Sequence, residues 1–301
     1  MSSEDKKVKM TDIMAYFISH TAIQLPADVV SGLEALRSRE DDPAALRIYD
    51  MMFENMRLAS ELGRPSCQDT GLVQFSIECG SNFPLLDSLA DILRDSVIKA
   101  SAMTPLRPNA VETFDERNTG NNTGTWCPVL LWDIVPGWDG CGIYTYLAGG
   151  GCSLPGCAKV LMPGEGYEGV VRFVLDRVTS YGLNACPPLL VGVGIAGSAE
   201  TAALLSKKAL LRPVGSHNPN PKAAEMERLL EDGINAIGIG PQGIGGSASV
   251  LGVNIENAAR HTATIGVGLS VGCWTHRRGH LVFDSDLSFT CETHPGFRYG
   301  Q

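Results

Sequence analysis

The sequence Cys67-Gln68-Asp69-Thr70-Gly71 places a thiol, an amide, a carboxylate and a hydroxyl in succession. The preceding residues 43–62 predict a helix, because apolar side chains recur every three or four positions, Asp42 can cap its start and Gly63 can end it. The following residues 73–78 alternate apolar and polar side chains, which predicts a half-buried strand. The five residues therefore form a short connection held on both sides by rigid elements, as active-site loops often are.

The composition is typical of a globular cytoplasmic protein. The 301 residues, 44% of them apolar, are enough to bury a large core. Nine cysteines, an odd number with no leading apolar segment, argue against a secreted disulfide framework and favour a reducing cytoplasm. A net charge of −9 disfavours nucleic acid as a partner, and no apolar run reaches the roughly 18 residues of a membrane span. We expect residues 1–9 to be a frayed polar end.

Helices and strands alternate along the chain with glycine-rich junctions, which predicts an α/β fold. We predict a mainly helical N-terminal portion over residues 1–65 and a mixed-sheet α/β core over residues 66–301, together forming a single catalytic domain. Further helices are expected at residues 27–39, 84–102, 169–181, 200–211 and 223–231, and strands at 129–135, 143–147, 189–193, 234–239, 250–255, 264–271 and 281–283.

One glycine motif, Gly192-Val-Gly194-Ile-Ala-Gly197, matches the fingerprint of dinucleotide-binding folds. Such a unit also needs a second strand that ends in an acidic residue about 20 positions further on. Residues 212–221 predict no strand and contain no carboxylate. We therefore do not expect a nicotinamide cofactor.

Two other segments suit an anionic ligand. The three glycines Gly149-Gly150-Gly151 follow a predicted strand and expose backbone N–H groups that a carboxylate or oxyanion could approach, although the glycines alone favour a tight turn. Arg107 lies in the segment Pro105-Leu106-Arg107-Pro108-Asn109, where two prolines make a rigid turn that determines its direction.

Three cysteines lie at junctions with unusual neighbours: Cys67 precedes Gln68, Cys186 precedes Pro187-Pro188, and Cys273 follows Gly272. Their wide separation is unlike that of a structural zinc site or a ferredoxin cluster, so the fold would have to assemble any shared ligand set. Three thiolates leave one iron of a cubane cluster without a protein ligand, and such an iron can act as a Lewis acid. The residues alone also allow Cys152 in the set, and allow each cysteine to be an inert core residue.

Six motifs in order resemble the class I iron-sulfur hydro-lyases, the family of the class I fumarases, over about residues 43–278. They are Cys-Gln-Asp-Thr-Gly at 67–71, Leu-Arg-Pro-Asn-Ala-Val-Glu at 106–112, Ala-Gly-Gly-Gly-Cys at 148–152, Asn-Ala-Cys-Pro-Pro at 184–188, Arg-His-Thr-Ala-Thr-Ile-Gly-Val-Gly at 260–268 and Gly-Cys-Trp-Thr-His-Arg-Arg-Gly at 272–279.

The resemblance implies the α-subunit fold of that family, a [4Fe-4S] cluster and a small dicarboxylate substrate. Its implied cluster ligands are Cys67, Cys186 and Cys273, with Cys152 outside the set. Its implied substrate contacts are Gln68, Arg107 and the backbone of Gly150, and Asp69 and His261 would relay a proton. The resemblance does not say whether His276, Arg277 and Arg278 face the cluster or a partner chain.

The segment after Cys152, with Ser153-Leu-Pro-Gly156 and Lys159-Val-Leu-Met-Pro163, resembles the tartrate-dehydrating members of the family, although Cys157 stands where they have a basic residue. The implied reaction is therefore dehydration of L(+)-tartrate to oxaloacetate, and interconversion of fumarate and L-malate is the alternative. A non-catalytic electron-transfer protein would be favoured by four close cysteines, which are absent. Single-chain members carry a further C-terminal domain, so the resemblance also implies a separate β subunit in an α2β2 assembly.

Overall fold

The computed structural model describes residues 2–300, which form two compact units. Unit 1 comprises residues 2–27, 55–149 and 277–300, and unit 2 comprises Asp28–Glu54 and Gly150–His276. Each unit has its own sheet and its own hydrophobic core. The α/β class is confirmed, while the single catalytic domain stays a prediction because compactness does not decide whether the units act separately.

Unit 1 contains a five-stranded sheet in the order β11-β10-β5-β1-β4. Strand β1 (Leu72–Gly80) pairs parallel with β4 (Val129–Val135) and antiparallel with β5 (Cys141–Ala148). Strand β10 (Arg278–Phe283) pairs antiparallel with β5 and with β11 (Phe289–Cys291). The strands predicted around residues 73–78, 129–135, 143–147 and 281–283 are confirmed.

Two helices of unit 1, α1 (Ser3–Ile23) and α4 (Leu89–Met103, after the short η1, Leu86–Ser88), pack against each other. Helix α1 also contacts β5 and β10. The expectation of a frayed end at residues 1–9 is wrong, because α1 begins at Ser3. Ser2 and Asp5 form a reciprocal capping box at this end: the Asp5 N–H donates to Ser2 Oγ at 3.1 Å, and the Ser2 N–H donates to Asp5 Oδ2 at 2.9 Å.

The helix predicted before the Cys67–Gly71 loop is confirmed as α3 (Pro43–Leu62), and α2 (Ala27–Ser38) precedes it. Asp42 Oδ1 accepts hydrogen bonds from the N–H groups of Ala44 and Ala45, at 2.8 and 2.9 Å. Gly63 adopts a left-handed conformation, with φ of 58°, directly after the helix. These caps explain why the sequence signals predicted both ends of this helix.

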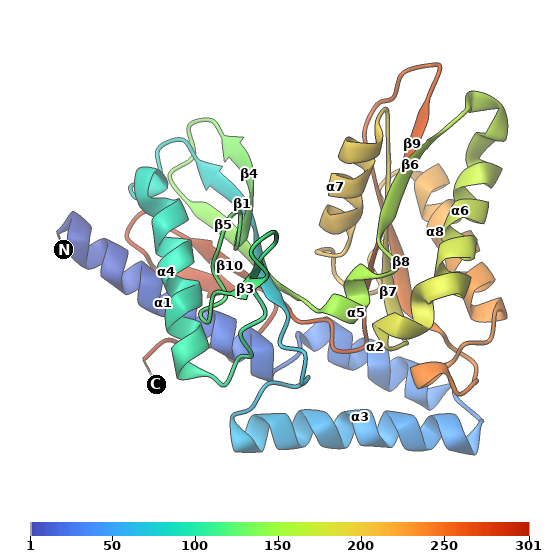
Figure 1. Ribbon diagram of the computed structural model, residues 1–301, viewed down its shortest axis with the longest axis horizontal. Helices are drawn as coiled ribbons and strands as arrows, with labels where there is room; N and C mark the ends of the chain where they lie inside the picture. The colour runs from blue at the N-terminus through green and yellow to red at the C-terminus, as the bar shows by residue number, and fades with distance from the viewer. Residues whose placement is uncertain (1, 301) are drawn as a thin grey trace. The chain divides into compact units, whose positions relative to one another are not determined.

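Unit 2 contains a four-stranded sheet in the order β6-β9-β7-β8. Strand β7 (Leu189–Ala196) pairs parallel with β8 (Val250–Asn257) and antiparallel with β9 (Ile265–Gly272), which pairs antiparallel with β6 (Cys157–Leu161). Helix α7 (Ala199–Ala209) covers one face of this sheet, and α6 (Gly166–Tyr181) and α8 (Pro221–Ala236) lie on the other (Figure 1).

The strand predicted at residues 234–239 is wrong, because α8 continues to Ala236. Its apolar side chains Leu230 and Ile234 are fully buried and lie one helical turn apart, so the core of unit 2 stabilises the helix. Gly238, with φ of 74°, then turns the chain away. The other helices and strands predicted for unit 2 are confirmed within a few residues.

The dinucleotide-like motif of β7 serves to pack a helix against the sheet. A Cβ atom on Gly192 would collide with the Ser206 carbonyl oxygen, and one on Gly194 would collide with the Ala202 carbonyl oxygen, both on α7. On the neighbouring strand β9, Gly268 faces Ala202 in the same way. These glycines therefore let the backbone of α7 approach the sheet more closely than any side chain would allow.

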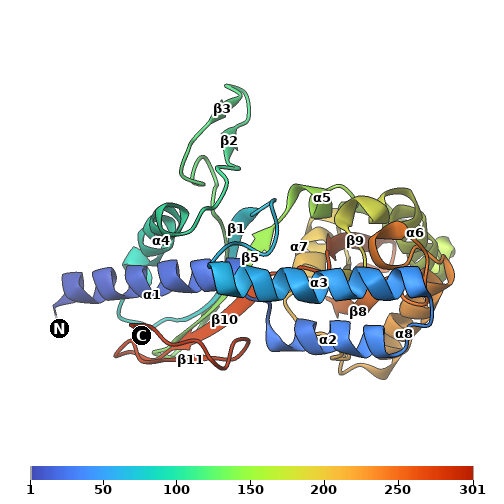
Figure 2. The same cartoon turned by 90° about the horizontal axis from the view of Figure 1, so that it is seen from below.

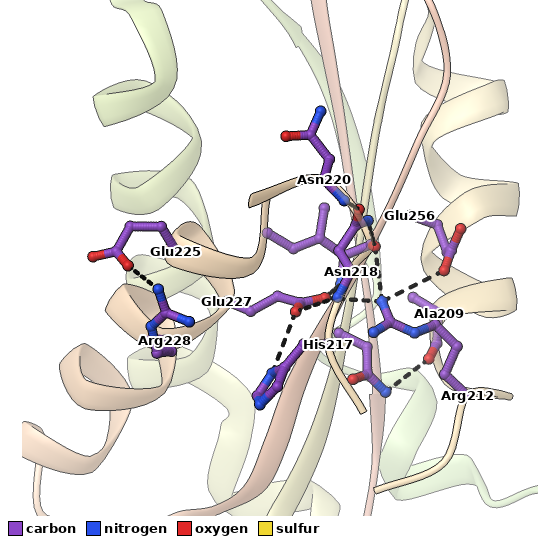
Figure 3. Close-up of polar contacts among 11 residues, drawn as sticks. Ala209, Arg212, His217, Asn218, Asn220, Glu225, Glu227, Arg228 and Glu256 are labelled. Atoms are coloured by element: carbon purple, nitrogen blue, oxygen red, sulfur yellow. Dashed lines mark hydrogen bonds and ion pairs between the residues drawn. The ribbon is translucent and has the colours of Figure 1, made fainter. Parts of the chain in front are cut away.

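A buried carboxylate covers the outer edge of β8, the last strand of this sheet (Figure 3). Glu227 Oε1 accepts hydrogen bonds from Arg212 Nη1 and from the N–H of Ile255, both at 2.8 Å, and Glu227 Oε2 accepts one from the N–H of Asn218 at 2.9 Å. The Ile255 carbonyl accepts from Asn218 Nδ2 at 2.7 Å. Backbone groups of this edge are thus satisfied by side chains, which leaves them unavailable to another strand.

The remaining regular elements are short. The β2–β3 hairpin (Val111–Glu112 and Arg117–Asn118) extends away from the sheet of unit 1 (Figure 2). Helix α5 (Gly150–Ser153) and the 3-10 turns η2 (Pro163–Glu165), η3 (Gly182–Ala185) and η4 (Pro241–Gly243) belong to unit 2. Between residues 2 and 300, none of the helices combines the length and the apolar character needed to cross a bilayer.

Candidate active site

The Cys67–Gly71 loop of unit 1 is held by the segment that carries Arg107. The Arg107 N–H donates to Thr70 Oγ1 at 2.9 Å, and Asn109 Nδ2 donates to the Gly71 carbonyl oxygen at 3.1 Å. Thr70 is buried, whereas the side chains of Gln68 and Arg107 are exposed. The segment that carries Arg107 is therefore held against the Cys67–Gly71 loop, which also carries Gln68.

Asp69 is half-buried in the same loop, beside the end of β5. Its Oδ1 atom accepts from the N–H of Gly71 at 3.0 Å and lies 3.5 Å from Asn109 Nδ2. Its Oδ2 atom lies 3.0 Å from the place that a Cβ atom on Gly149 would occupy. The first of the three glycines therefore leaves room for the Asp69 carboxylate.

Arg277 reaches the same loop from the start of β10. Its side chain is only 2% exposed, and its Nη2 atom donates to the Asp69 carbonyl oxygen at 2.7 Å. The Arg277 carbonyl in turn accepts from the N–H of Leu147 on β5 at 3.0 Å. Asp69 is therefore held by residues from three later segments of the sequence, Gly71, Asn109 and Arg277.

Cys186 and Cys273 come together at one end of the sheet of unit 2. Cys186 precedes β7 and Cys273 follows β9, and these strands are antiparallel neighbours. The Trp274 N–H donates to the Cys186 carbonyl oxygen at 3.2 Å. Cys186 is exposed with φ of 54°, and Cys273 Sγ lies 3.0 Å from Thr275 Oγ1. Two widely separated cysteines are thus brought to the same place by strand pairing.

Gly150 is near these cysteines within unit 2. It begins α5, which contacts β9 and η3, the turn that leads into Cys186. A Cβ atom on Gly151 would press against the Asn184 carbonyl oxygen in η3, so this glycine permits the close approach. The glycine run therefore serves both units: Gly149 accommodates Asp69, and Gly151 allows α5 to pack near Cys186.

The positions of the cysteines within each unit are compatible with ligands of an iron-sulfur cluster. Cys186 and Cys273 supply thiols at one sheet end, as two ligands of a shared cluster require. Cys67 belongs to unit 1, and its thiol lies 3.7 Å from Gln68 Oε1. No group of three or more Cys, His, Asp or Glu side chains suited to a metal ion occurs among residues 2–300. The three-cysteine set therefore stays a prediction.

The other cysteines of this region have apolar surroundings. Cys152 is buried in the core of unit 2, and Cys157 is half-buried against it. Burial raises the pKa of the Cys157 thiol, which disfavours the thiolate that a metal would require. Cys157 therefore has a packing role, and the exclusion of Cys152 from the ligand set stays a prediction.

His261 lies at the opposite end of the sheet from Cys186 and Cys273. It is exposed in the loop between β8 and β9, where the Thr264 side chain bonds to the Gly197 carbonyl at 2.9 Å. An eight-residue strand spans roughly 25 Å. Unit 2 of one chain therefore keeps His261 apart from its two candidate cluster cysteines.

A cavity of about 380 Å³ lies at this same opposite end, beyond the carboxyl ends of β7 and β8. Its walls include Ile195, Lys222, Met226 and Arg260. The cavity and the cysteines thus occupy different ends of the sheet.

Two site residues received no role from the sequence, Asn109 and Arg277. Asn109 follows Arg107 by two positions, and its amide reaches both the Thr70 side chain and the Gly71 carbonyl. Arg277 follows Cys273 by four positions and meets Asp69 across most of the chain. Their polar side chains next to predicted site residues were the available signal, but their partners depend on tertiary structure.

Comparisons with known proteins agree with this architecture. The sequence model of the family described as Fumarate hydratase (Fumerase) matches residues 11–282. The chain is 54% identical to proteins named L(+)-tartrate dehydratase subunit alpha from Escherichia coli O157:H7 and Escherichia coli strain K12, over 98% of this chain and 98% of each relative. It is 34% identical to a putative L(+)-tartrate dehydratase subunit alpha from Methanocaldococcus jannaschii, over 90% of this chain and 96% of that protein. The chain therefore belongs to the fumarate hydratase (Fumerase) family.

Proposed function

We propose that this chain is the α subunit of an iron-sulfur-dependent hydro-lyase that dehydrates L(+)-tartrate to oxaloacetate. The observation that carries the choice of substrate is the 54% identity, over nearly the whole length, to relatives named for that reaction. The clamped loop with Gln68, Asp69 and Arg107 supports a site for a small polar substrate, because rigid donors must be in place before such a ligand binds.

The cofactor would be a [4Fe-4S] cluster held by Cys67, Cys186 and Cys273. When bound, its iron without a protein ligand supplies Lewis-acid polarisation of the departing hydroxyl. Two features of this chain support that set. The Trp274 N–H, directly after Cys273, donates to the Cys186 carbonyl at one sheet end, and Cys67 directly precedes Gln68 and Asp69.

The protein residues would bind and orient the dicarboxylate. Arg107 is exposed on a rigid turn and can clamp a carboxylate with two parallel N–H groups, a geometry that lysine cannot reproduce. Gln68 is exposed beside it and can donate to a hydroxyl or carboxylate oxygen. The backbone N–H of Gly150 would stabilise a developing oxyanion, a type of contact whose loss costs about 3 kcal/mol in other enzymes.

Asp69 and His261 would move protons. The Asp69 carboxylate is held by Gly71 and Asn109, so its direction is fixed before the substrate arrives. Because His261 is roughly a strand length from Cys186 and Cys273 in its own chain, its participation would require a second α chain. The proposed α2β2 assembly supplies one.

A separate β subunit would complete the site with a catalytic base and further carboxylate-binding groups. The name of the relatives, subunit alpha, supports such a partner. We place the enzyme in the cytoplasm, where a reducing environment keeps the cluster ligands as thiols and thiolates.

The proposal is tested by assembling the α chain with its β subunit and a cluster under anaerobic conditions. We expect turnover of L(+)-tartrate to exceed that of L-malate and fumarate, and we expect the α chain alone to bind a cluster without turning over. Faster turnover of fumarate or malate would favour the alternative, a class I fumarate hydratase. Full activity of the α chain alone would contradict the need for a partner.

A second experiment examines Asp69. The Asp69→Asn enzyme should keep its cluster absorbance and lose most of its turnover, because the amide cannot accept a proton. Asp286→Asn, on an exposed loop of the same unit, is the matched control and should remain active. An Asp69→Asn enzyme with an intact cluster and full turnover would exclude the proton relay.

A further inference from the structure

The guanidinium group of Arg277 is buried with part of its hydrogen-bonding capacity unused. Its side chain is 2% exposed, and Nη2 donates to the Asp69 carbonyl oxygen at 2.7 Å. Its Nε and Nη1 atoms have no hydrogen-bond partner among residues 2–300. Arg277 also forms no ion pair within the part of the chain that the structure describes.

Arg212, another largely buried arginine, shows how the protein compensates a buried positive charge. Arg212 lies 2.8 Å from a carboxylate oxygen of Glu227, which is itself 2% exposed. A buried positive charge is costly without such a counter-charge, and each buried N–H group without an acceptor adds to that cost. For Arg277 the protein supplies one carbonyl oxygen and no anion, so an acceptor from outside the chain is expected.

The position of Arg277 indicates what that acceptor is. The guanidinium group contacts the backbone of Asp69, and Asp69 lies in the loop that is clamped to the Arg107 turn. A C4 dicarboxylate carries two carboxylate groups, and Arg107 can clamp only one of them. A second arginine that contacts the same loop would suit the second carboxylate, because arginine binds planar anions with directed N–H groups.

We propose that Arg277 binds a carboxylate of the substrate through the nitrogens that the protein leaves without acceptors, while its Nη2 atom holds Asp69 in position. This assignment rests on the proposed function and adds a substrate-binding residue to it. One guanidinium group then connects the bound anion directly to the residue proposed to transfer a proton.

The test uses the complete α–β enzyme with its cluster and measures the dissociation constant of L(+)-tartrate by calorimetry, together with KM and kcat. Arg277→Gln should raise the dissociation constant and KM about 10-fold to 100-fold, the loss expected for hydrogen bonds to a charged group. Arg277→Lys should show a smaller increase, and added guanidinium ion should restore part of the affinity of Arg277→Gln. The visible absorbance of the cluster should match that of the unmodified enzyme.

Arg212→Gln is the matched control, because it removes a buried arginine that has a protein counter-charge. It should lower the thermal unfolding temperature and leave the affinity for tartrate unchanged. An Arg277→Gln enzyme with unchanged affinity and reduced kcat would overturn substrate binding and leave only the contact with Asp69. Loss of the cluster in Arg277→Gln would equally overturn the proposal, because the acceptor that Arg277 binds would then be the cluster and not the substrate.

Failure of the proposed function gives a different result. If calorimetry detects no binding of tartrate, malate or fumarate to the unmodified enzyme, and the enzyme turns over none of them, the proposed function fails before Arg277 is examined. If the unmodified enzyme binds and dehydrates tartrate and Arg277→Gln binds it equally well, the proposed function stands and only the role of Arg277 is refuted.

Discussion

Replacing Glu227 by glutamine should destabilise unit 2 strongly while preserving the shape of the side chain. Glu227 accepts three hydrogen bonds, from Arg212 Nη1, the Ile255 N–H and the Asn218 N–H, all between 2.8 and 2.9 Å. A glutamine has only one oxygen, so its NH2 group must face at least one of these donors. Strand β8, through Ile255, and the segment after α7, through Arg212 and Asn218, would then lose hydrogen bonds to helix α8.

The expected size follows from these contacts. A buried donor left without an acceptor costs about 1–3 kcal/mol. Arg212 also loses its main counter-charge, and breaking a fully buried ion pair costs roughly 3–5 kcal/mol. Because the Arg212 side chain is 16% exposed, water recovers part of that loss. We therefore expect Glu227→Gln to lower the free energy of unfolding by about 3 kcal/mol.

The same helix provides the control. Glu225 pairs with Arg228 on the surface of α8, where the two side chains are 71% and 55% exposed (Figure 3). Glu225→Gln removes the same charge and should cost less than about 0.5 kcal/mol, as exposed ion pairs usually do. Urea unfolding measures both variants, and hydrogen exchange of the β8 peptides reports the Ile255 amide directly. Equal unfolding free energies for the two variants, with unchanged protection of Ile255, would refute this account of the β8 edge.

Three further predictions concern packing, pH and the loop clamp. Gly194→Ala should destabilise the protein by about 3 kcal/mol or more, because its Cβ would collide with the α7 backbone, whereas Gly164→Ala, which faces open space, should be near neutral in thermal unfolding. Burial lowers the pKa of His294 from 6.5 to about 4, so the folded state binds fewer protons than the unfolded state between these values. Stability should thus be complete above pH 6.5 and fall by up to about 3 kcal/mol as the pH drops toward 4, and His294→Gln should flatten this dependence in unfolding measured against pH. Asn109→Ala should reduce turnover about 10-fold with the cluster retained, because the Gly71 carbonyl loses its donor, and unchanged kcat and KM would argue against the clamp.

The sequence predicted best those elements whose ends carry local signals. Asp42 and Gly63 mark both ends of α3, and both act as the pattern indicated. The start of α1 was missed because its first residues are charged and polar, although Ser2 and Asp5 form a capping box. Residues 234–239 look like a strand by composition, but the burial of Leu230 and Ile234 one turn apart favours the helix.

The candidate site divides in a similar way. The chemistry of the Cys67–Gly71 loop is visible in consecutive residues, and strand pairing brings Cys186 and Cys273 to one sheet end as the cysteine argument requires. The contact between Arg277 and Asp69 could not be predicted, since it joins residues 208 positions apart. The separation of His261 from the cysteines depends on the order and direction of β7, β8 and β9, and no local pattern encodes that order.

The glycines of β7 and β9 show that one spacing has two physical origins. A phosphate-binding turn needs glycine so that a ligand can reach the main chain. In this protein the group that reaches the main chain is the backbone of helix α7. The two cases differ in what stands opposite the missing side chain: a carbonyl of a packed helix repels a diphosphate, whereas N–H groups attract one. A fingerprint of this kind thus identifies a position where another group comes into close contact with the backbone. The polarity of the contacting surface tells whether that group is a nucleotide or another part of the protein.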